Sequence, residues 1–229
     1  MKLTSNLGIS IRKEEKKKKF NIIELFKPDL SLLILIISNL ITIILAITQH
    51  WNLISIMWIF WVQSVIIGIF NFIRILTLKE FSTKNFKIND HSVEPTESTK
   101  KFTAFFFLIH YGIFHLVYMI FLLSNHAELN GIPITYNITL NSSEIMGIII
   151  MGLIFFGNHL FSFIYNYEKD SKKVRNIGTV MFFPYARIFP MHLTIAFGLF
   201  LINDAGSIFL FLILKTIADV IMHQVEHKL

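Results

Sequence analysis

The sequence predicts an all-α polytopic membrane protein, a bundle of six transmembrane helices with both termini on the cytoplasmic side. Three observations predict this class: the composition, six long apolar segments, and the placement of Lys and Arg along the chain. Of the 229 residues, 54% are hydrophobic and only 16% are charged. A soluble domain of this length cannot bury so much apolar surface, so the composition excludes the ordinary water-soluble classes.

Each apolar segment has close to the roughly 20 residues that a helix needs to cross about 30 Å of hydrocarbon. The six segments run from Leu30 to Thr48, Leu53 to Leu78, Phe102 to Leu123, Ile145 to Tyr165, Tyr185 to Ile202, and Ser207 to Val225. The fifth is the weakest because it begins among Pro184, Arg187 and Pro190, and a kink at Pro190 is compatible with a helix there. The connections are short, so any function must lie within the bundle or on its loops.

The positions of the basic residues predict the orientation independently of hydropathy. Of the 21 Lys and Arg, 20 lie at or near the segments assigned to the cytoplasm, and none lies in the three connections assigned to the outside. The positive-inside rule therefore places both termini inside. Residues 1–29 contain a basic run and are expected to form a disordered cytoplasmic tail, while residues 30–229 form the membrane domain. The Ile-, Lys- and Asn-rich composition favours a prokaryotic plasma membrane.

The composition also limits the chemistry and the partners. Cysteine is absent from the sequence, which excludes disulfides, thiol nucleophiles and thiolate metal sites. Phosphate-binding glycine loops, nucleophile elbows and dinucleotide fingerprints are absent as well. Membrane topology accounts for the net charge of +6, so no nucleic-acid partner is implied. We expect membrane lipids as partners, and a homo-oligomer stays open.

Ionisable side chains inside the membrane are the most informative feature, since each costs several kcal/mol unless it is paired or hydrated. A rise of ~1.5 Å per residue, counted from the predicted inner end of each helix, places four of them in one layer about 10 Å deep. They come from four different helices: His110, His159, His192 and Asp219. Neutral imidazoles with one carboxylate suit a divalent ion of zinc, iron or manganese, so this layer is a candidate metal site. A haem with His110 and His192 as axial ligands is a less favoured alternative.

Further polar residues surround this layer and are expected to support it or to line a path. They are Gln63, Asn71, Arg74, His115, Arg187, Lys215 and His223. On the sixth predicted helix, Lys215, Asp219 and His223 are spaced four residues apart, which stacks them on one face. Lys215 and Asp219 are expected to neutralise each other as a buried ion pair.

Three functions from different classes are compatible with these residues. The leading hypothesis is a metal-dependent membrane enzyme, in which a metal-activated water acts on a lipid-phase substrate. The first alternative is a proton-coupled small-solute transporter or channel, with Lys215, Asp219 and His223 as a proton relay. The second is a scaffold subunit whose buried polar groups only hold helices together. The predicted outer half carries few polar residues beyond His115 and Gln63, which favours the enzyme.

Four strings in the chain resemble those of an uncharacterised family of small multi-pass membrane proteins from archaea and bacteria. They are WVQSVIIGIFNFIRIL (residues 61–76), HYGIFH (110–115), PYARIFPMH (184–192) and KTIADVIMHQVEH (215–227). The resemblance spans most of the chain from the first helix onward and implies the same helical architecture. It implies no activity, but it highlights His110, Arg187, His192, Lys215 and Asp219. That family commonly has Glu where this chain has Gln63, which puts a proton or metal role at this position in doubt.

Overall fold

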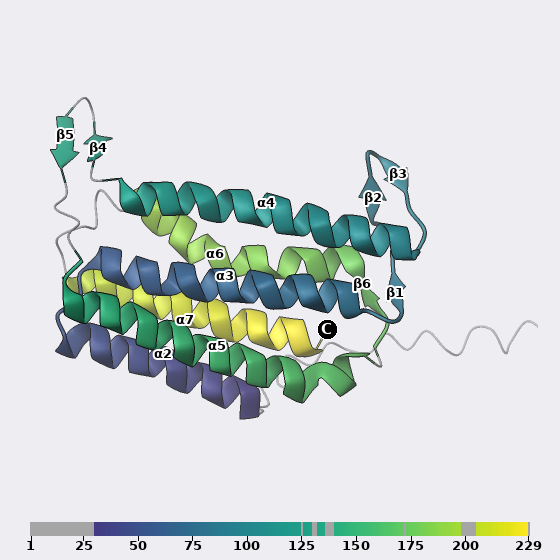
Figure 1. Cartoon of the computed structure of the whole chain (residues 1–229), viewed down its shortest axis with the longest axis horizontal. Helices are drawn as coiled ribbons and strands as arrows, with labels where there is room; N and C mark the ends of the chain where they lie inside the picture. Colours follow the sequence, from purple (N-terminus) through teal and green to yellow (C-terminus); the bar gives the residue numbers. More distant parts are fainter. Residues whose placement is uncertain are drawn as a thin grey trace, which may run out of the picture.

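The computed structural model describes residues 30–124, 126–129, 132–135, 140–171, 173–197 and 205–228. Within these residues the chain forms six helices that run side by side along one long axis (Figure 1). They are α2 (Leu30–Thr48), α3 (Leu53–Thr77), α4 (Glu97–Leu123), α5 (Ser142–Ser171), α6 (Ile177–Phe197) and α7 (Ala205–Lys228). The predicted cytoplasmic tail, residues 1–29, lies outside the described residues.

Four of the described helices are long and apolar enough to cross a membrane: α2, α3, α4 and the part of α5 over Ser142–Glu168. Their outward faces carry large apolar side chains, such as Ile109 (63% exposed), Leu153 (67%) and Ile164 (64%). Contact between this surface and water would be unfavourable, whereas the hydrocarbon of a bilayer accepts it. These four helices and their apolar surface support the coarser prediction, a helical membrane protein.

Helix α3 lies at the centre of the bundle. It packs against α4, α5 and α6, while α2 packs against α5 and α7, and α6 packs against α4 and α7. Buried aromatic and aliphatic side chains fill the space between these helices, among them Ile56, Phe60, Phe107 and Phe155. The buried polar residues of α3 therefore face other helices rather than lipid.

The predicted bounds hold best for the first two helices. Helix α2 spans the predicted residues, and α3 ends one residue early, at Thr77. Helix α4 begins at Glu97, five residues before the predicted start, because Thr96 caps it. The Thr96 side chain accepts a hydrogen bond from the backbone N–H of Thr99 at 3.2 Å, which satisfies one of the free donors of the first turn.

The predicted start of the fifth helix was wrong by eight residues, since α6 begins at Ile177. Asn176 Oδ1 accepts a hydrogen bond from the backbone N–H of Thr179 at 3.1 Å and caps the helix. As a result Pro184 and Pro190 both lie inside α6 rather than at its start. A proline inside a helix removes a backbone hydrogen bond and promotes bending, and α6 is visibly bent in Figure 1.

Short strands at the two ends of the bundle were not part of the all-α prediction. At one end β1 (Phe81–Ser82) pairs in parallel with β6 (Arg175–Asn176), and β2 (Lys87–Ile88) pairs antiparallel with β3 (His91–Ser92). At the other end β4 (His126–Leu129) and β5 (Ile132–Thr135) form a hairpin. We call these the basic end and the hairpin end, because the connection from residue 78 to 96 at the first contains three lysines.

Candidate functional site

Lys215 and Asp219 form a buried ion pair on α7, as their spacing predicts. Lys215 Nζ lies 2.6 Å from Asp219 Oδ1, and the two side chains are only 2% and 0% exposed. The ammonium group also lies 5.0 Å from the centroid of the Phe60 ring. Two opposite charges inside the bundle are tolerated because each neutralises the other.

Hydrogen bonds from two other helices complete the pair. The Gln63 side chain on α3 accepts from Lys215 Nζ at 2.9 Å and donates to Asp219 Oδ2 at 3.2 Å. Asn39 Nδ2 on α2 donates to the same carboxylate oxygen at 3.1 Å. Sequence reasoning missed Asn39, although it belongs to a stripe of small and polar residues at helical spacing on α2: Ser31, Ser38, Asn39, Thr42 and Ala46. The pair therefore links α2, α3 and α7.

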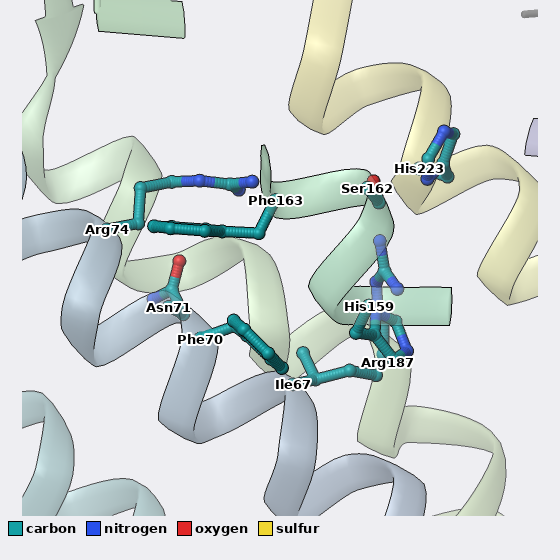
Figure 2. A pocket seen from close by; sticks show the side chains of 9 residues that line it. All are labelled: Ile67, Phe70, Asn71, Arg74, His159, Ser162, Phe163, Arg187 and His223. Atoms are coloured by element: carbon teal, nitrogen blue, oxygen red, sulfur yellow. The ribbon is translucent and has the colours of Figure 1, made fainter. Parts of the chain in front are cut away.

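A small cavity of about 20 Å³ lies toward the basic end from this pair, since Asn71 and Arg74 of its lining follow Gln63 on α3. Figure 2 shows the side chains that line it. Four helices line it, through Ile67, Phe70, Asn71, Arg74, His159, Ser162, Phe163, Arg187 and His223. In Figure 2 Arg187 and His159 lie beside each other at one side of the cavity, and Arg74 extends over Phe163 at the other. The predicted supporting residues Asn71, Arg74, Arg187 and His223 thus meet at one place.

Polar contacts hold several of the lining side chains. Asn71 Nδ2 donates to the Val180 carbonyl at 3.2 Å. His223 Nε2 and Ser31 Oγ share a hydrogen bond of 3.0 Å. Among the described residues, the buried His159 Nε2 has no hydrogen-bond partner. This nitrogen is therefore available to a ligand or a water in the cavity.

Five ionisable groups in this region act on one another electrostatically, and we call them the charged cluster: His159, Arg187, Lys215, Asp219 and His223. His159 interacts electrostatically with each of the other four groups. Arg187 is 3% exposed and interacts with Asp219 and, on α4, with Tyr111. The charged cluster thus combines a lysine, an arginine, one carboxylate and two imidazoles, which are side chains that can bind ions or exchange protons.

The structure does not bring the four predicted metal ligands together. His159 and Asp219 belong to the charged cluster, but His110 and His192 have exposed side chains. His110 Nδ1 shares a hydrogen bond of 2.8 Å with Tyr185 Oη, and His192 Nδ1 shares one of 3.2 Å with Tyr118 Oη. In the part of the chain that the structure describes, no group of three or more His, Asp or Glu side chains could hold a metal ion.

The reason lies in the helix bounds and in the rotation of α4. His192 is 15 residues from the start of α6 at Ile177, about 22 Å along the helix rather than 10 Å. His110, about 20 Å along α4 from Glu97, lies at nearly the same level as His159, which is about 18 Å along α5 from Ser171. His110 is apart from His159 because it projects from the outward face of α4, beside the exposed Ile109.

His115 lies outside the charged cluster, in a second polar group between α3 and α4. Its side chain is 4% exposed, with Nδ1 bonded to the Tyr111 carbonyl at 2.9 Å. Trp61 Nε1 donates to the His115 carbonyl at 2.9 Å, and Ser64 Oγ lies 2.9 Å from Tyr111 Oη. Of these groups only His115, which the sequence already assigns to the outer half, extends toward the hairpin end, because Ser64 and Tyr111 lie on the basic-end side of Gln63 and His115.

A layer of three buried phenylalanines closes the charged cluster on the side of the hairpin end. Phe60, Phe155 and Phe211 lie one helical turn toward that end from Gln63, His159 and Lys215 respectively. Ring centroids are 6.2 Å apart for Phe60 and Phe155 and 5.7 Å apart for Phe60 and Phe211. We call these three side chains the aromatic layer.

Comparison with known families gives one match. A family of unknown function, DUF6498, matches residues 23–229, which includes every described helix. The chain belongs to this family. Membership in DUF6498 confirms the resemblance to an uncharacterised family that the four sequence strings indicate. None of the curated proteins and none of the solved structures matches the chain. Because DUF6498 has no assigned activity, a function for the chain must be argued from its own residues.

Proposed function

We propose that the protein is a proton-coupled carrier of a small solute and that it crosses the plasma membrane six times, with both termini in the cytoplasm. Helices α6 and α7 have 21 and 24 residues, enough for a bilayer, and run alongside the four apolar helices (Figure 1). The lysines of the basic end support a cytoplasmic location for that end.

One observation carries the proposal: Arg187 lies between Pro184 and Pro190 of α6 and acts on the buried Asp219 of α7. Membrane carriers commonly build their solute sites on helices that are broken near the middle of the membrane. Helix α6 is continuous from Ile177 to Phe197, and its two internal prolines supply a local weak point of the same kind. A bent helix that holds a buried charge can change its bend when the charge gains or loses a partner. Neither an enzyme nor a scaffold needs a buried charge on a bent helix.

Polar groups on both sides of the aromatic layer also support a carrier. The charged cluster lies on the cytoplasmic side of the layer, and His115 lies beside Trp61 at the level of the layer. The buried Tyr118 lies one helical turn farther toward the hairpin end, where its Oη shares a hydrogen bond with His192 Nδ1. A solute that crosses the membrane needs polar contacts over most of the thickness, whereas an enzyme site needs them at one depth. The closed aromatic layer fits a state in which the charged cluster faces the cytoplasm.

Asp219 is the group that we assign to proton coupling. It is the only carboxylate of the charged cluster, and it faces Lys215, Arg187, Asn39 and Gln63. Protonation of Asp219 would end its ion pair with Lys215 and change the charge that Arg187 experiences. Proton uptake and solute binding are therefore linked through the same side chains.

The proposal is tested by electrical recording from liposomes that contain the full chain on a solid-supported membrane. Concentration jumps of inorganic phosphate, sulfate, acetate, succinate, amino acids and sugars are applied at constant ionic strength. We expect a saturable current for one class, which responds to a pH gradient in the wild type and not in Asp219→Asn. Glu97→Gln, which changes an exposed carboxylate in the same way, serves as control. Absence of both a current and a solute-dependent change of internal pH for every solute, or equal pH dependence in Asp219→Asn, would overturn the carrier.

Metal analysis separates the carrier from a metal-dependent enzyme. Because only His159 and Asp219 of the predicted ligands share a site, we expect less than stoichiometric zinc, iron or manganese in protein purified without a His-tag. Elemental analysis in mild detergent measures this. One metal ion per chain, lost in His159→Ala, would instead support the enzyme.

A further inference from the structure

Two adjoining pockets lie at the basic end, outside the charged cluster and near the short strands β1, β2 and β6 (Figure 1). One of about 490 Å³ lies between β2, α4 and α6, and one of about 930 Å³ lies between the chain after β1, β6, α6 and α7. Asn85, Phe86 and Phe182 line both, so we call the two pockets together the Phe86 groove. Volumes of this size are typical of sites for organic ligands.

The chain that separates the two pockets is anchored to the start of α6. Asn176 Nδ2 donates to the Lys84 carbonyl oxygen at 2.7 Å. Asn85 has a φ of 60°, a left-handed conformation that Asn tolerates and that turns the chain here. Phe86 then packs directly over Gly178, where a Cβ would lie only 2.7 Å from Phe86 Cδ2. The Phe86 groove is therefore formed by the fold before any ligand binds.

One part of the groove is apolar and belongs to the membrane-spanning helices. Phe102, Phe106 and Phe182 line it and are 52%, 46% and 62% exposed, and Met181 and Met222 also contribute. The apolar segment of α4 starts at Phe102, directly after two lysines. This part of the groove therefore lies where the hydrocarbon of a bilayer begins.

The other part of the groove is basic. Lys84 and Lys87 are exposed and supply its charge, while Asp and Glu are absent from the residues that line either pocket. The acidic residues of the same connection, Glu80, Asp90 and Glu94, lie outside both linings. Among the described residues, neither lysine side chain has an ion-pair partner. Both ammonium groups are therefore available to an anion at the level of the lipid headgroups.

We propose that the Phe86 groove binds one anionic phospholipid. Lys84 and Lys87 contact the phosphate, and the two acyl chains lie against the phenylalanines on either side of Phe86. Basic pockets at the ends of membrane helices bind anionic headgroups in this way, and a soluble anion would leave the apolar part uncovered. The inference is independent of the carrier, because it requires only that the basic end lies at a membrane surface.

Lipid binding to the full chain in detergent, measured by native mass spectrometry, tests the inference. Phosphatidylglycerol and phosphatidylcholine with identical acyl chains form a matched pair that differs in headgroup charge. We expect one phosphatidylglycerol per chain, bound about tenfold more tightly than phosphatidylcholine. Glycerophosphoglycerol, which is the same anionic headgroup without acyl chains, should not bind. Equal binding of the two lipids, or binding of glycerophosphoglycerol as tight as that of the lipid, would overturn the inference.

A pair of double variants tests the basic part. Lys84→Gln/Lys87→Gln is expected to lower the affinity for phosphatidylglycerol about tenfold, to that for phosphatidylcholine. Lys79→Gln/Lys101→Gln is the control, because it removes the same charge from exposed lysines of the same end that do not line the groove. Equal losses in the two double variants would assign the binding to general surface charge and overturn the site.

A pair of single variants tests the apolar part. Phe105 and Phe106 are neighbours on α4 and are 52% and 46% exposed, but only Phe106 lines the groove. We expect Phe106→Gln to bind phosphatidylglycerol more weakly than the wild type, and Phe105→Gln to bind it equally well. Unchanged affinity in Phe106→Gln would show that the acyl chains lie elsewhere and contradict the proposed site.

Discussion

Replacing Asp219 by Leu is expected to destabilise the protein more than any other single change in the charged cluster. The variant leaves the buried Lys215 without its ion-pair partner and removes a carboxylate that interacts with Arg187. Removal of one partner of a buried ion pair typically costs about 3–5 kcal/mol in free energy of unfolding. Lys215→Met should cost less, because Asp219 keeps Arg187, Asn39 and Gln63 as partners.

The double variant Lys215→Met/Asp219→Leu provides the matched control. It removes both charges, and apolar side chains of similar volume replace a buried ion pair at little cost in stability. We expect it to recover most of the stability lost in Asp219→Leu, as measured by thermal unfolding in detergent, and to show no transport. A double variant whose destabilisation equals the sum of the two single ones would contradict a direct ion pair.

Phe155→Ala is expected to open the aromatic layer and to make the protein leak protons. Phe155 is fully buried against Phe60, and truncation of a buried Phe to Ala costs about 3–5 kcal/mol and leaves a cavity. This cavity would join the charged cluster to the polar groups on the side of the hairpin end. Water that enters it would conduct protons across the layer.

A pH-sensitive dye inside liposomes measures the leak. The neighbouring Phe156→Ala is the control, because Phe156 is 47% exposed on the outward face of the same helix. We expect faster dissipation of a pH gradient in Phe155→Ala than in the wild type, and no change in Phe156→Ala. Equal rates in all three proteins would show that the aromatic layer is not the barrier.

Hydropathy and spacing predicted the helical architecture and the Lys215–Asp219 pair, because both depend on local sequence. The position of His192 along its helix was predicted wrongly, because it depends on the first residue of α6. The Asn176 cap extends α6 toward the basic end and shifts His192 out of the predicted layer. This asparagine, followed closely by Thr179, was a signal that hydropathy alone does not use.

The rotation of each helix was harder to predict. In a membrane, apolar side chains occur on all faces of a helix, so hydropathy does not show which side of α4 faces the lipid. His110 lies on the outward face of α4, whereas Tyr111, the next residue, is buried. Asn39 was not predicted because the polar residues of α2 are uncharged, and nothing in their sequence indicates that one of them donates a hydrogen bond to Asp219. The charged cluster is therefore only partly the predicted site.

Access to the cavity from both sides of the membrane is the central property of a carrier, and the absence of cysteine from the chain makes it directly measurable. Ser162→Cys places a thiol in the cavity lining, and Ser92→Cys places one in an exposed strand at the basic end. In sealed vesicles of known orientation, each variant meets a small, membrane-impermeant methanethiosulfonate reagent on one side. We predict that Ser162→Cys reacts from either side and Ser92→Cys only from the cytoplasmic side. Reaction of Ser162→Cys from the cytoplasmic side alone would contradict a carrier.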